Sequence, residues 1–227
     1  MTDSMSPAMN RPANFDRLAR VYRWMEFVTF GPALNRCRCR YVDQLGDCRT
    51  ALVLGDGDGR FTARLLQANP AIRIDAVDAS PAMLDALLRQ AGPGRNRVRT
   101  HLADARSWSP AGQSYDLIVT HFFLDCLTTD EVVRLAARLL SCTTSRTLWV
   151  VSEFAIPRQG FGRAMAQLIV AALYWAFGRL TGLPVHSLPA YREALSKEGF
   201  TLRREDHPVW GLLSSEVWLA GPGAAGG

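Results

Sequence analysis

The chain has 227 residues, of which 48% are hydrophobic, and this is enough to build one globular domain with a full core. Its formal net charge is +5, and the excess comes from arginines scattered along the chain, which argues against a nucleic-acid-binding patch. The five cysteines are odd in number and lack CxxC spacing, so we expect reduced thiols, no metal site and a cytoplasmic location.

The first 46 residues precede the alternation of strands and helices. Residues 1–13 contain no apolar core of a secretory signal, and we expect them to be a flexible lead. Residues 14–46 are expected to form a helical cap, with Tyr22 on an apolar helix face. Arginine and cysteine alternate over residues 36–40 on a predicted helix, where residues two apart do not share a face. We therefore expect a solvated helix surface there, with a phosphate-binding patch as the alternative.

Residues 51–60, ALVLGDGDGR, predict a buried strand that runs into a turn and opens a helix. Gly55, Gly57 and Gly59 alternate along this turn, and Asp56 lies between the first two. A side chain at the glycine positions would hinder a tight turn and keep the backbone away from a ligand. We expect this glycine loop to wrap around a ligand, and an ordinary turn between strand and helix is the alternative.

Polar residues follow the next strands. A predicted strand at 72–77 ends in Asp78, about twenty residues after the glycine loop, where an acid can accept the hydroxyls of a ribose. The strand at 98–102 leads to Asp104, and the strand at 115–120 leads to His121. The first two strand ends alone fit either a dinucleotide or S-adenosylmethionine.

The order of these motifs resembles the class I S-adenosylmethionine-dependent methyltransferases, which have a glycine loop, an acid after strand two and an Asp before a small residue after strand three. The resemblance places the glycine loop, with Asp56, at the methionine end of the cofactor. It implies that Asp78 and Ala79 hold the ribose, and that Asp104 and Ala105 meet the adenine.

The chain departs from this family pattern at one point. Val53 stands where many members have an acid that helps to hold the amino group of the cofactor. Asp56 and Asp58 are the candidates to supply the missing negative charge.

The rest of the chain continues the alternation that is typical of a parallel sheet with helices on both faces. Ser80 and Pro81 predict a helix start, and Thr128 and Glu131 predict a capping box. We expect an α/β, Rossmann-like, doubly wound seven-stranded sheet with an antiparallel last strand. The expected bounds are a strand at 147–152, a helix at 191–198, strands at 200–204 and 216–219, a single domain at 14–220 and a flexible tail at 221–227.

Two further segments resemble the ubiquinone and menaquinone C-methyltransferases. Residues 15–22, FDRLARVY, are similar to a helix that folds over the cofactor in that family, which implies that Tyr22 faces the cofactor. The apolar residues 161–183 lie where the family carries its substrate lid, and we expect a lid insertion at 160–188. Core packing is the alternative for both segments. A dimer contact or a peripheral membrane contact is also open for the second, whose apolar run is too short to span a bilayer.

The chemistry implied is in-line attack on a sulfonium methyl group, which needs a proton acceptor only if the methyl acceptor must lose a proton. His121 and Asp125 after strand four are the expected catalytic residues, with Glu153 after strand five as a further candidate. His121 ranks first because histidine titrates near neutrality. A structural histidine is the alternative at that position, and His207 is expected to be structural or exposed.

We therefore expect methyl transfer from S-adenosylmethionine, with S-adenosylhomocysteine as product, to a small apolar or aromatic acceptor such as a quinol or a natural product. The alternatives are an RNA, DNA or protein methyltransferase and a non-catalytic S-adenosylmethionine-binding protein. Nucleic acid is the weaker choice, because residues 120–123, THFF, lack the paired prolines of base-amine methyltransferases and no RNA-binding module is visible.

Overall fold

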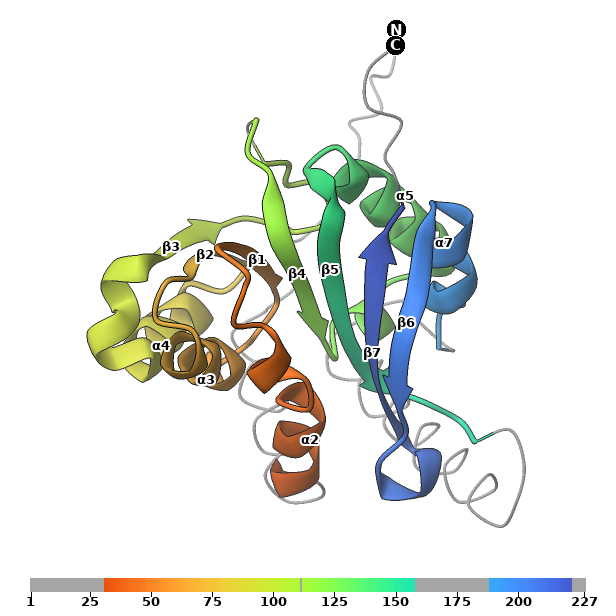
Figure 1. Ribbon diagram of the computed structural model, residues 1–227, viewed down its shortest axis with the longest axis horizontal. Helices are drawn as coiled ribbons and strands as arrows, with labels where there is room; N and C mark the ends of the chain where they lie inside the picture. The colour runs from red at the N-terminus through yellow and green to blue at the C-terminus, as the bar shows by residue number, and fades with distance from the viewer. Residues whose placement is uncertain (1–30, 111, 158–187, 222–227) are drawn as a thin grey trace, which may run out of the picture.

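The computed structural model describes residues 31–110, 112–157 and 188–221. They form a seven-stranded sheet with the strand order β3-β2-β1-β4-β5-β7-β6 (Figure 1). The strands are β1 Thr50–Leu54, β2 Arg73–Asp78, β3 Val98–Leu102, β4 Tyr115–His121, β5 Thr143–Phe154, β6 Phe200–Asp206 and β7 Leu213–Ala220. The α-helices are α2 Gly31–Arg38, α3 Arg60–Ala68, α4 Pro81–Ala91, α5 Thr129–Leu140 and α7 Tyr191–Lys197. Short 3-10 helices are η2 Val42–Gln44, η3 Gly92–Arg97, η4 Leu124–Cys126 and η5 Val209–Gly211.

The sheet confirms the predicted doubly wound fold with an antiparallel last strand. Strands β1 to β5 pair in parallel, and β7 lies antiparallel between β5 and β6. The carboxyl ends of β1 to β5 and of β6 therefore share one edge of the sheet. The chain order reverses between β1 and β4, and open α/β sheets bind their ligands at the carboxyl edge beside such a reversal.

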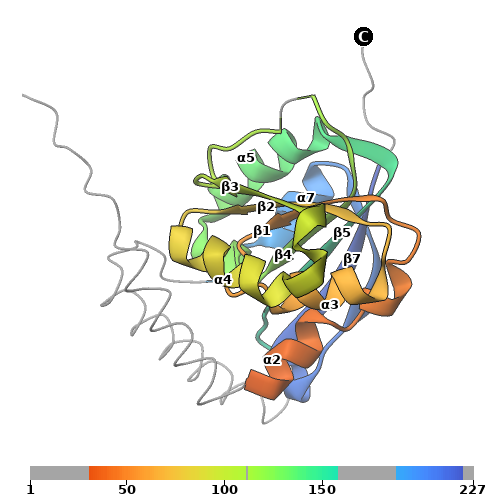
Figure 2. The same cartoon turned by 90° about the vertical axis from the view of Figure 1, so that its left-hand side faces the viewer.

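Helices cover both faces of the sheet. Helices α3 and α4 lie on one face, and α5 and α7 lie on the other (Figure 2). The alternation of side chains along β1 explains this sandwich, because Ala51 and Val53 join the core under α3 and α4, whereas Leu52 and Leu54 join the core under α5 and α7. A strand buried on both faces reads as a continuous apolar run, as residues 51–54 do.

The predicted helix starts are confirmed in atomic detail. The Ser80 hydroxyl accepts a hydrogen bond from the Met83 backbone N–H at 3.4 Å and begins α4. Thr128 and Glu131 form the reciprocal capping box that begins α5. Helix α4 begins three residues after the end of β2, whereas α5 follows β4 only after the short helix η4, so the two caps end a short and a longer loop at the carboxyl edge.

The expectation of a solvated surface over residues 36–40 is wrong at Arg38. Helix α2 does not present a uniformly solvated surface, because Arg38 is only 5% exposed and its guanidinium lies 5.2 Å from the ring centre of Phe122. Arg36 is exposed, and Arg40 forms an ion pair with Asp206 at 2.7 Å. The alternation of residue types could not reveal this difference, since burial of Arg38 depends on the β4 end that packs against the helix.

Several expectations fall on residues outside the described ranges. These are the lead at 1–13, Tyr22 and the cap before residue 31, the lid through residue 187 and the tail beyond residue 221. The Gly221 backbone N–H donates to the Gly199 carbonyl at 3.0 Å, so hydrogen bonding reaches the first residue of the expected tail.

Three further observations concern the described residues only. None of their helices is long and apolar enough to cross a membrane. No group of three or more metal-ligating side chains occurs among them. All five cysteines lie within the described ranges and are free thiols.

Candidate functional site

The glycine loop connects β1 to α3 at the carboxyl edge of the sheet, and all three of its glycines have positive φ angles, +67°, +62° and +83°. A Cβ atom on Gly55 would lie 2.6 Å from the Phe123 ring, and one on Gly59 would lie 2.5 Å from the Leu87 backbone. A Cβ atom on Gly57 would meet nothing within 4 Å. Gly55 and Gly59 thus allow close packing within the protein, whereas Gly57 borders open space in which a ligand can approach the backbone.

The two acids between these glycines turn toward α3. One carboxylate oxygen of Asp56 accepts the Thr62 backbone N–H at 2.9 Å, and Asp58 accepts from Arg60 at 3.0 Å. The other oxygen of each carboxyl group is buried and has no hydrogen-bond partner among the described residues. Burial raises the pKa of Asp56 to about 6. These unpaired acceptors leave hydrogen-bonding capacity in the loop, which a bound ligand can satisfy.

Asp78 ends β2 beside the glycine loop, and Ala79 follows it. Its carboxylate accepts the Ser80 backbone N–H at 2.8 Å, so it also supports the turn into α4. Burial raises the pKa of Asp78 to about 6. The Gly55 backbone N–H donates to the Val77 carbonyl at 3.0 Å, which holds the two strand ends together.

Asp104 follows β3 and is half-buried with a cation beside it. The Arg106 guanidinium donates to both of its oxygens, the shortest distance being 2.6 Å. Burial opposes ionisation of Asp104, but the hydrogen bonds from Arg106 outweigh it and lower the pKa of this carboxyl group. Ala105 is buried in the core. A carboxylate has about four acceptor positions, so the Arg106 contact leaves Asp104 able to accept from a ligand amine as well.

His121, at the end of β4, lies in a setting that its sequence position did not indicate. Its side chain is 2% exposed, lies edge-on to Phe61 with ring centres 4.5 Å apart, and has no hydrogen-bond partner for either ring nitrogen among the described residues. Burial, with a smaller contribution from the Arg38 cation, lowers the pKa of His121 well below its ordinary value. The expectation that this histidine titrates near neutrality is therefore wrong, because its ring is desolvated.

Glu153, near the end of β5, anchors the turn after β4. It is 1% exposed, and one carboxylate oxygen accepts the backbone N–H groups of Phe123 at 3.1 Å and Leu124 at 2.8 Å. The other oxygen accepts from the Asp125 N–H at 3.4 Å. Burial, followed by the nearby Asp125 carboxylate, raises the pKa of Glu153 well above its ordinary value, and burial raises the pKa of Asp125 to about 6. Glu153 thereby fixes the turn that places Phe123 against Gly55.

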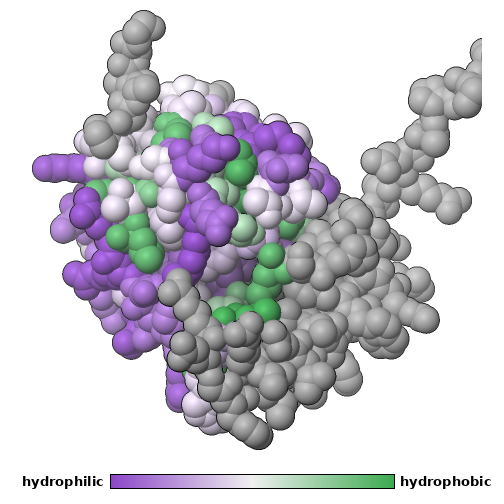
Figure 3. Space-filling view, turned by 90° about the vertical axis from the view of Figure 1, so that its right-hand side faces the viewer, coloured by the Kyte–Doolittle hydropathy of each residue, from purple (hydrophilic) through white to green (hydrophobic). Residues whose placement is uncertain are grey.

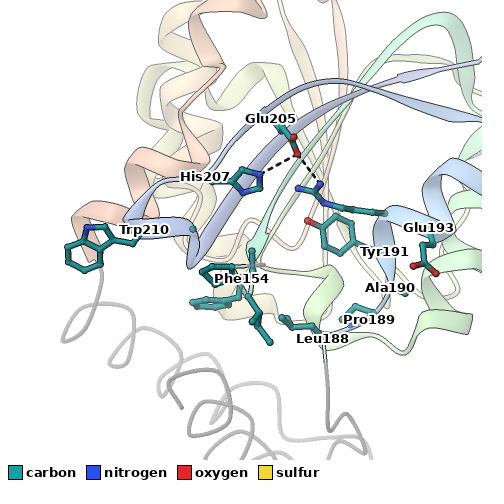
Figure 4. A pocket seen from close by; sticks show the side chains of 14 residues that line it. Phe154, Leu188, Pro189, Ala190, Tyr191, Glu193, Glu205, His207 and Trp210 are labelled. Carbon is teal, nitrogen blue, oxygen red and sulfur yellow. Dashed lines mark hydrogen bonds and ion pairs between the residues drawn. The ribbon is translucent and has the colours of Figure 1, made fainter. Parts of the chain in front are cut away.

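A cavity of about 690 Å³ lies at the same edge of the sheet, where β5 and β6 end and α7 begins (Figure 4). Figure 3 views the side of the molecule that carries β6 and α7, where hydrophobic residues (green) lie among hydrophilic ones. The apolar part of the lining consists of Phe154, Ala155, Ile156, Pro157, Leu188, Pro189, Ala190 and Trp210. Trp210 is 91% exposed at the η5 loop.

Charged residues form the rest of the cavity wall. Arg192 donates to Glu205 at 2.9 Å and forms an ion pair at 2.6 Å with Glu216, which is fully buried. Glu205 is also 3.3 Å from His207 (dashed lines in Figure 4). The Tyr191 hydroxyl donates to Glu216 at 2.6 Å.

The ends of β4 and β5 lie between the glycine loop and the cavity along the carboxyl edge of the sheet. Phe122 follows β4 with a φ of +51°, and its ring centre lies 5.2 Å from that of Phe154, which lines the cavity. The Phe122 backbone N–H donates to the Ser152 carbonyl at 2.7 Å. This aromatic pair joins the end of β4 to the end of β5.

The structure thus brings the glycine loop, Asp78, Asp104 and His121 to one edge of the sheet, as the strand order requires. Sequence reasoning missed Phe123, Arg106 and the cavity residues Arg192 and Glu205. The partners of Phe123 and Arg192 are distant in the chain, so no local pattern marks these residues. Arg106 pairs with Asp104 only two residues away, so the spacing of these two charges was a signal that could have indicated it. His207 is exposed as expected, but it also lines the cavity.

Comparison with known proteins agrees with this arrangement. A family model described as a methyltransferase domain matches residues 51–145, which contain the glycine loop, Asp78 and Asp104. Trans-aconitate 2-methyltransferase of Escherichia coli strain K12 / DH10B is 45% identical over 74 residues, which are 33% of this chain and 27% of that relative. The chain thus spans about a quarter of the length of this curated relative.

Solved structures share the fold at low sequence identity. The mitomycin 7-O-methyltransferase MmcR has a TM-score of 0.69 and 18% identity, over 93% of this chain and 62% of that chain. Human N-acetylserotonin methyltransferase, solved in complex with S-adenosylmethionine, has a TM-score of 0.64 and 15% identity, over 95% of this chain and 60% of that chain. Residues 51–145 thus match the methyltransferase-domain model, and the seven-stranded sheet has the fold of these solved methyltransferases.

Proposed function

We propose that this protein transfers a methyl group from S-adenosylmethionine to a small, apolar or aromatic acceptor. The observation that carries the proposal is the placement of two sites at one edge of the sheet. The glycine loop, Asp78 and Asp104 follow β1, β2 and β3, and a largely apolar cavity of about 690 Å³ lies at the ends of β5 and β6.

The residues at the ends of β1 to β3 fit the cofactor. Gly57 leaves its backbone open on the ligand side, and Asp56 and Asp58 each keep a buried oxygen without a partner among the described residues. We assign the glycine loop to the methionine end, Asp78 with Ala79 to the ribose, and Asp104 with Ala105 to the adenine. Carboxylates are suited to the last two tasks because they accept hydrogen bonds from hydroxyl and amine groups.

When bound, S-adenosylmethionine supplies a sulfonium methyl group that is open to in-line attack. The protein's own part is to align the acceptor and to exclude water from it. Phe154, which lines the cavity, packs against Phe122 and makes this part of the site apolar. His121 and Asp125 remain our candidates for direct contact with the reactants, and the buried His121 ring, whose pKa is lowered, is suited to hydrogen bonding and not to accepting a proton.

The acceptor class follows from the cavity. Its lining is mainly aliphatic and aromatic, which favours an apolar ring system over a strongly hydrated metabolite. The names of the similar proteins support a small-molecule acceptor as well, since trans-aconitate 2-methyltransferase, the mitomycin 7-O-methyltransferase and N-acetylserotonin methyltransferase are each named for one.

A turnover assay tests the proposal. The full chain is incubated with S-adenosylmethionine and a panel of phenols, quinols, aromatic amines, polycarboxylates, RNA, DNA and protein, and formation of S-adenosylhomocysteine is measured. We expect product with one of the aromatic small molecules. Methylation of only nucleic acid or protein would overturn the acceptor class. Binding of S-adenosylhomocysteine without turnover on any acceptor would favour a non-catalytic binding protein.

A further inference from the structure

The charged residues of the cavity come from α7 and the end of β6, and Figure 4 shows Glu205 and His207 across from Leu188 and Pro189, with Glu193 beside Ala190. Glu193 and Arg192 come from the first turn of α7, and Glu205 and His207 come from the end of β6. Phe154 and Leu188 belong to the apolar side. An acceptor in this cavity would therefore place a ring against hydrocarbon and a substituent against charge.

Among the described residues that line the cavity, Arg192 is the one lysine or arginine. Its positive charge is already paired with two carboxylates of the protein. It lies between Glu205 at 2.9 Å and the fully buried Glu216 at 2.6 Å, and it donates to the Ser214 hydroxyl at 3.2 Å. Releasing Arg192 to bind an anionic acceptor would leave Glu216 buried without its counter-ion, which is costly.

The lining therefore carries an excess of negative charge. Among the described residues, the exposed Glu193 and Glu205 line the cavity and Glu216 lies behind Arg192, so three carboxylates share the single positive charge of Arg192. A carboxylate on the acceptor would meet like charges, whereas an ammonium group would find a carboxylate partner beside an apolar wall.

We propose that the cavity selects aromatic acceptors that carry a cationic amine and rejects acceptors that carry a carboxylate. This inference rests on the proposed function, because it assigns the cavity to the acceptor of the methyl group. It adds a charge preference that is the opposite of the carboxylate acceptor for which trans-aconitate 2-methyltransferase is named.

Binding to the full chain saturated with S-adenosylhomocysteine tests the inference without turnover. The probes share a phenol ring and differ in one group: tyramine has an amine, 3-(4-hydroxyphenyl)propionate a carboxylate and 4-ethylphenol neither. Calorimetry should rank tyramine first, then 4-ethylphenol and last the carboxylate. We expect steps of about fivefold in Kd at low salt, the size of a partly exposed ion pair, and smaller steps at high salt.

Glu205→Gln removes a charge from the wall and keeps the shape of the side chain. Tyramine affinity should fall by about fivefold while 4-ethylphenol affinity stays the same. Glu193→Gln should act in the same direction. Glu198→Gln is the matched control, since Glu198 follows the same helix and does not line the cavity, and it should leave the ranking unchanged. A melting curve for each variant verifies folding.

Three results would overturn the inference: equal or tighter binding of the carboxylate by the unaltered chain, no binding of any probe, or the same ranking in both cavity variants and the control. Failure of the proposed function is recognised separately. In that case S-adenosylhomocysteine would not bind, or no acceptor would be methylated, whereas methylation of a carboxylate acceptor would retain the function and refute only the charge preference.

Discussion

The Asp78 carboxylate accepts the backbone N–H of Ser80, the residue that caps α4. Asp78 is also the last residue of β2, the strand end to which we assign the ribose. Asp78→Ala should weaken binding of S-adenosylhomocysteine by about 1.5–3 kcal/mol for each lost charge-assisted hydrogen bond. Calorimetry measures this loss. Asp85→Asn, on the exposed side of α4, is the control and should bind as the unaltered chain does. Unchanged affinity in Asp78→Ala would refute the ribose assignment.

The same residue predicts a pH dependence. Burial raises the pKa of Asp78 to about 6 in the free protein, and the ionised form is the better acceptor for ribose hydroxyls. Affinity for S-adenosylhomocysteine should therefore be constant above about pH 6 and fall as the pH is lowered through that value, where protonation competes with binding. Asp78→Asn should flatten this part of the profile, and an equally steep fall in that variant would assign the effect to another group.

At the scale of elements, the turn after β4 depends on a residue of the neighbouring strand. Glu153→Ala removes the acceptor for three backbone N–H groups, so we expect a loss of about 1–3 kcal/mol in the free energy of unfolding. Glu153→Gln should recover most of it, because a single amide oxygen can still accept from Phe123 and Leu124. Denaturant unfolding of both variants measures the difference, and equal losses in the two would show that the amide cannot replace the carboxylate.

The glycine loop joins β1 to α3, and substitutions of its glycines should have different effects on stability and on cofactor binding. Gly59→Ala places a Cβ atom 2.5 Å from the Leu87 backbone, so it should cost about 1–3 kcal/mol of stability by separating α3 from α4. Gly57→Ala has open space and should cost only about 1 kcal/mol for its positive φ, while it obstructs the cofactor. Denaturation and calorimetry together separate the two effects. Tight cofactor binding by Gly57→Ala would exclude a close approach of the ligand at that point.

At the scale of the whole molecule, a ligand that bridges three strand ends should stabilise the folded chain. At a concentration one hundred times its Kd, S-adenosylhomocysteine should add about 2.7 kcal/mol, which corresponds to a rise of about 5–10 °C in Tm for a domain of this size. NAD at the same concentration is the control and should give no rise, since we assign the three acids to the other ligand. Equal stabilisation by NAD would reopen the choice between the two nucleotides.

Local patterns of the chain predicted most of the fold. Residues 98–102 form β3 as expected, the Thr128 capping box begins α5, and the last two strands form an antiparallel pair. Such signals reside in neighbouring residues, because periodicity, caps and turns are decided over a few positions. The predicted ends of the strands were less accurate. Strand β5 begins at Thr143 and ends at Phe154, beyond the expected 147–152, because pairing with β4 and β7 extends it.

The sequence by itself determined the order of the motifs, and with it the strand ends that carry the glycine loop, Asp78 and Asp104. Only the tertiary structure decided what surrounds each side chain. It buried His121 against Phe61, placed Arg38 over Phe122 and assembled the cavity from residues 154–157 and 188–193 together with Glu205, His207, Trp210 and Gly211. Burial and charge pairing depend on segments that are distant in the chain and meet only when the sheet and its helices assemble. No local pattern in the sequence therefore indicates them.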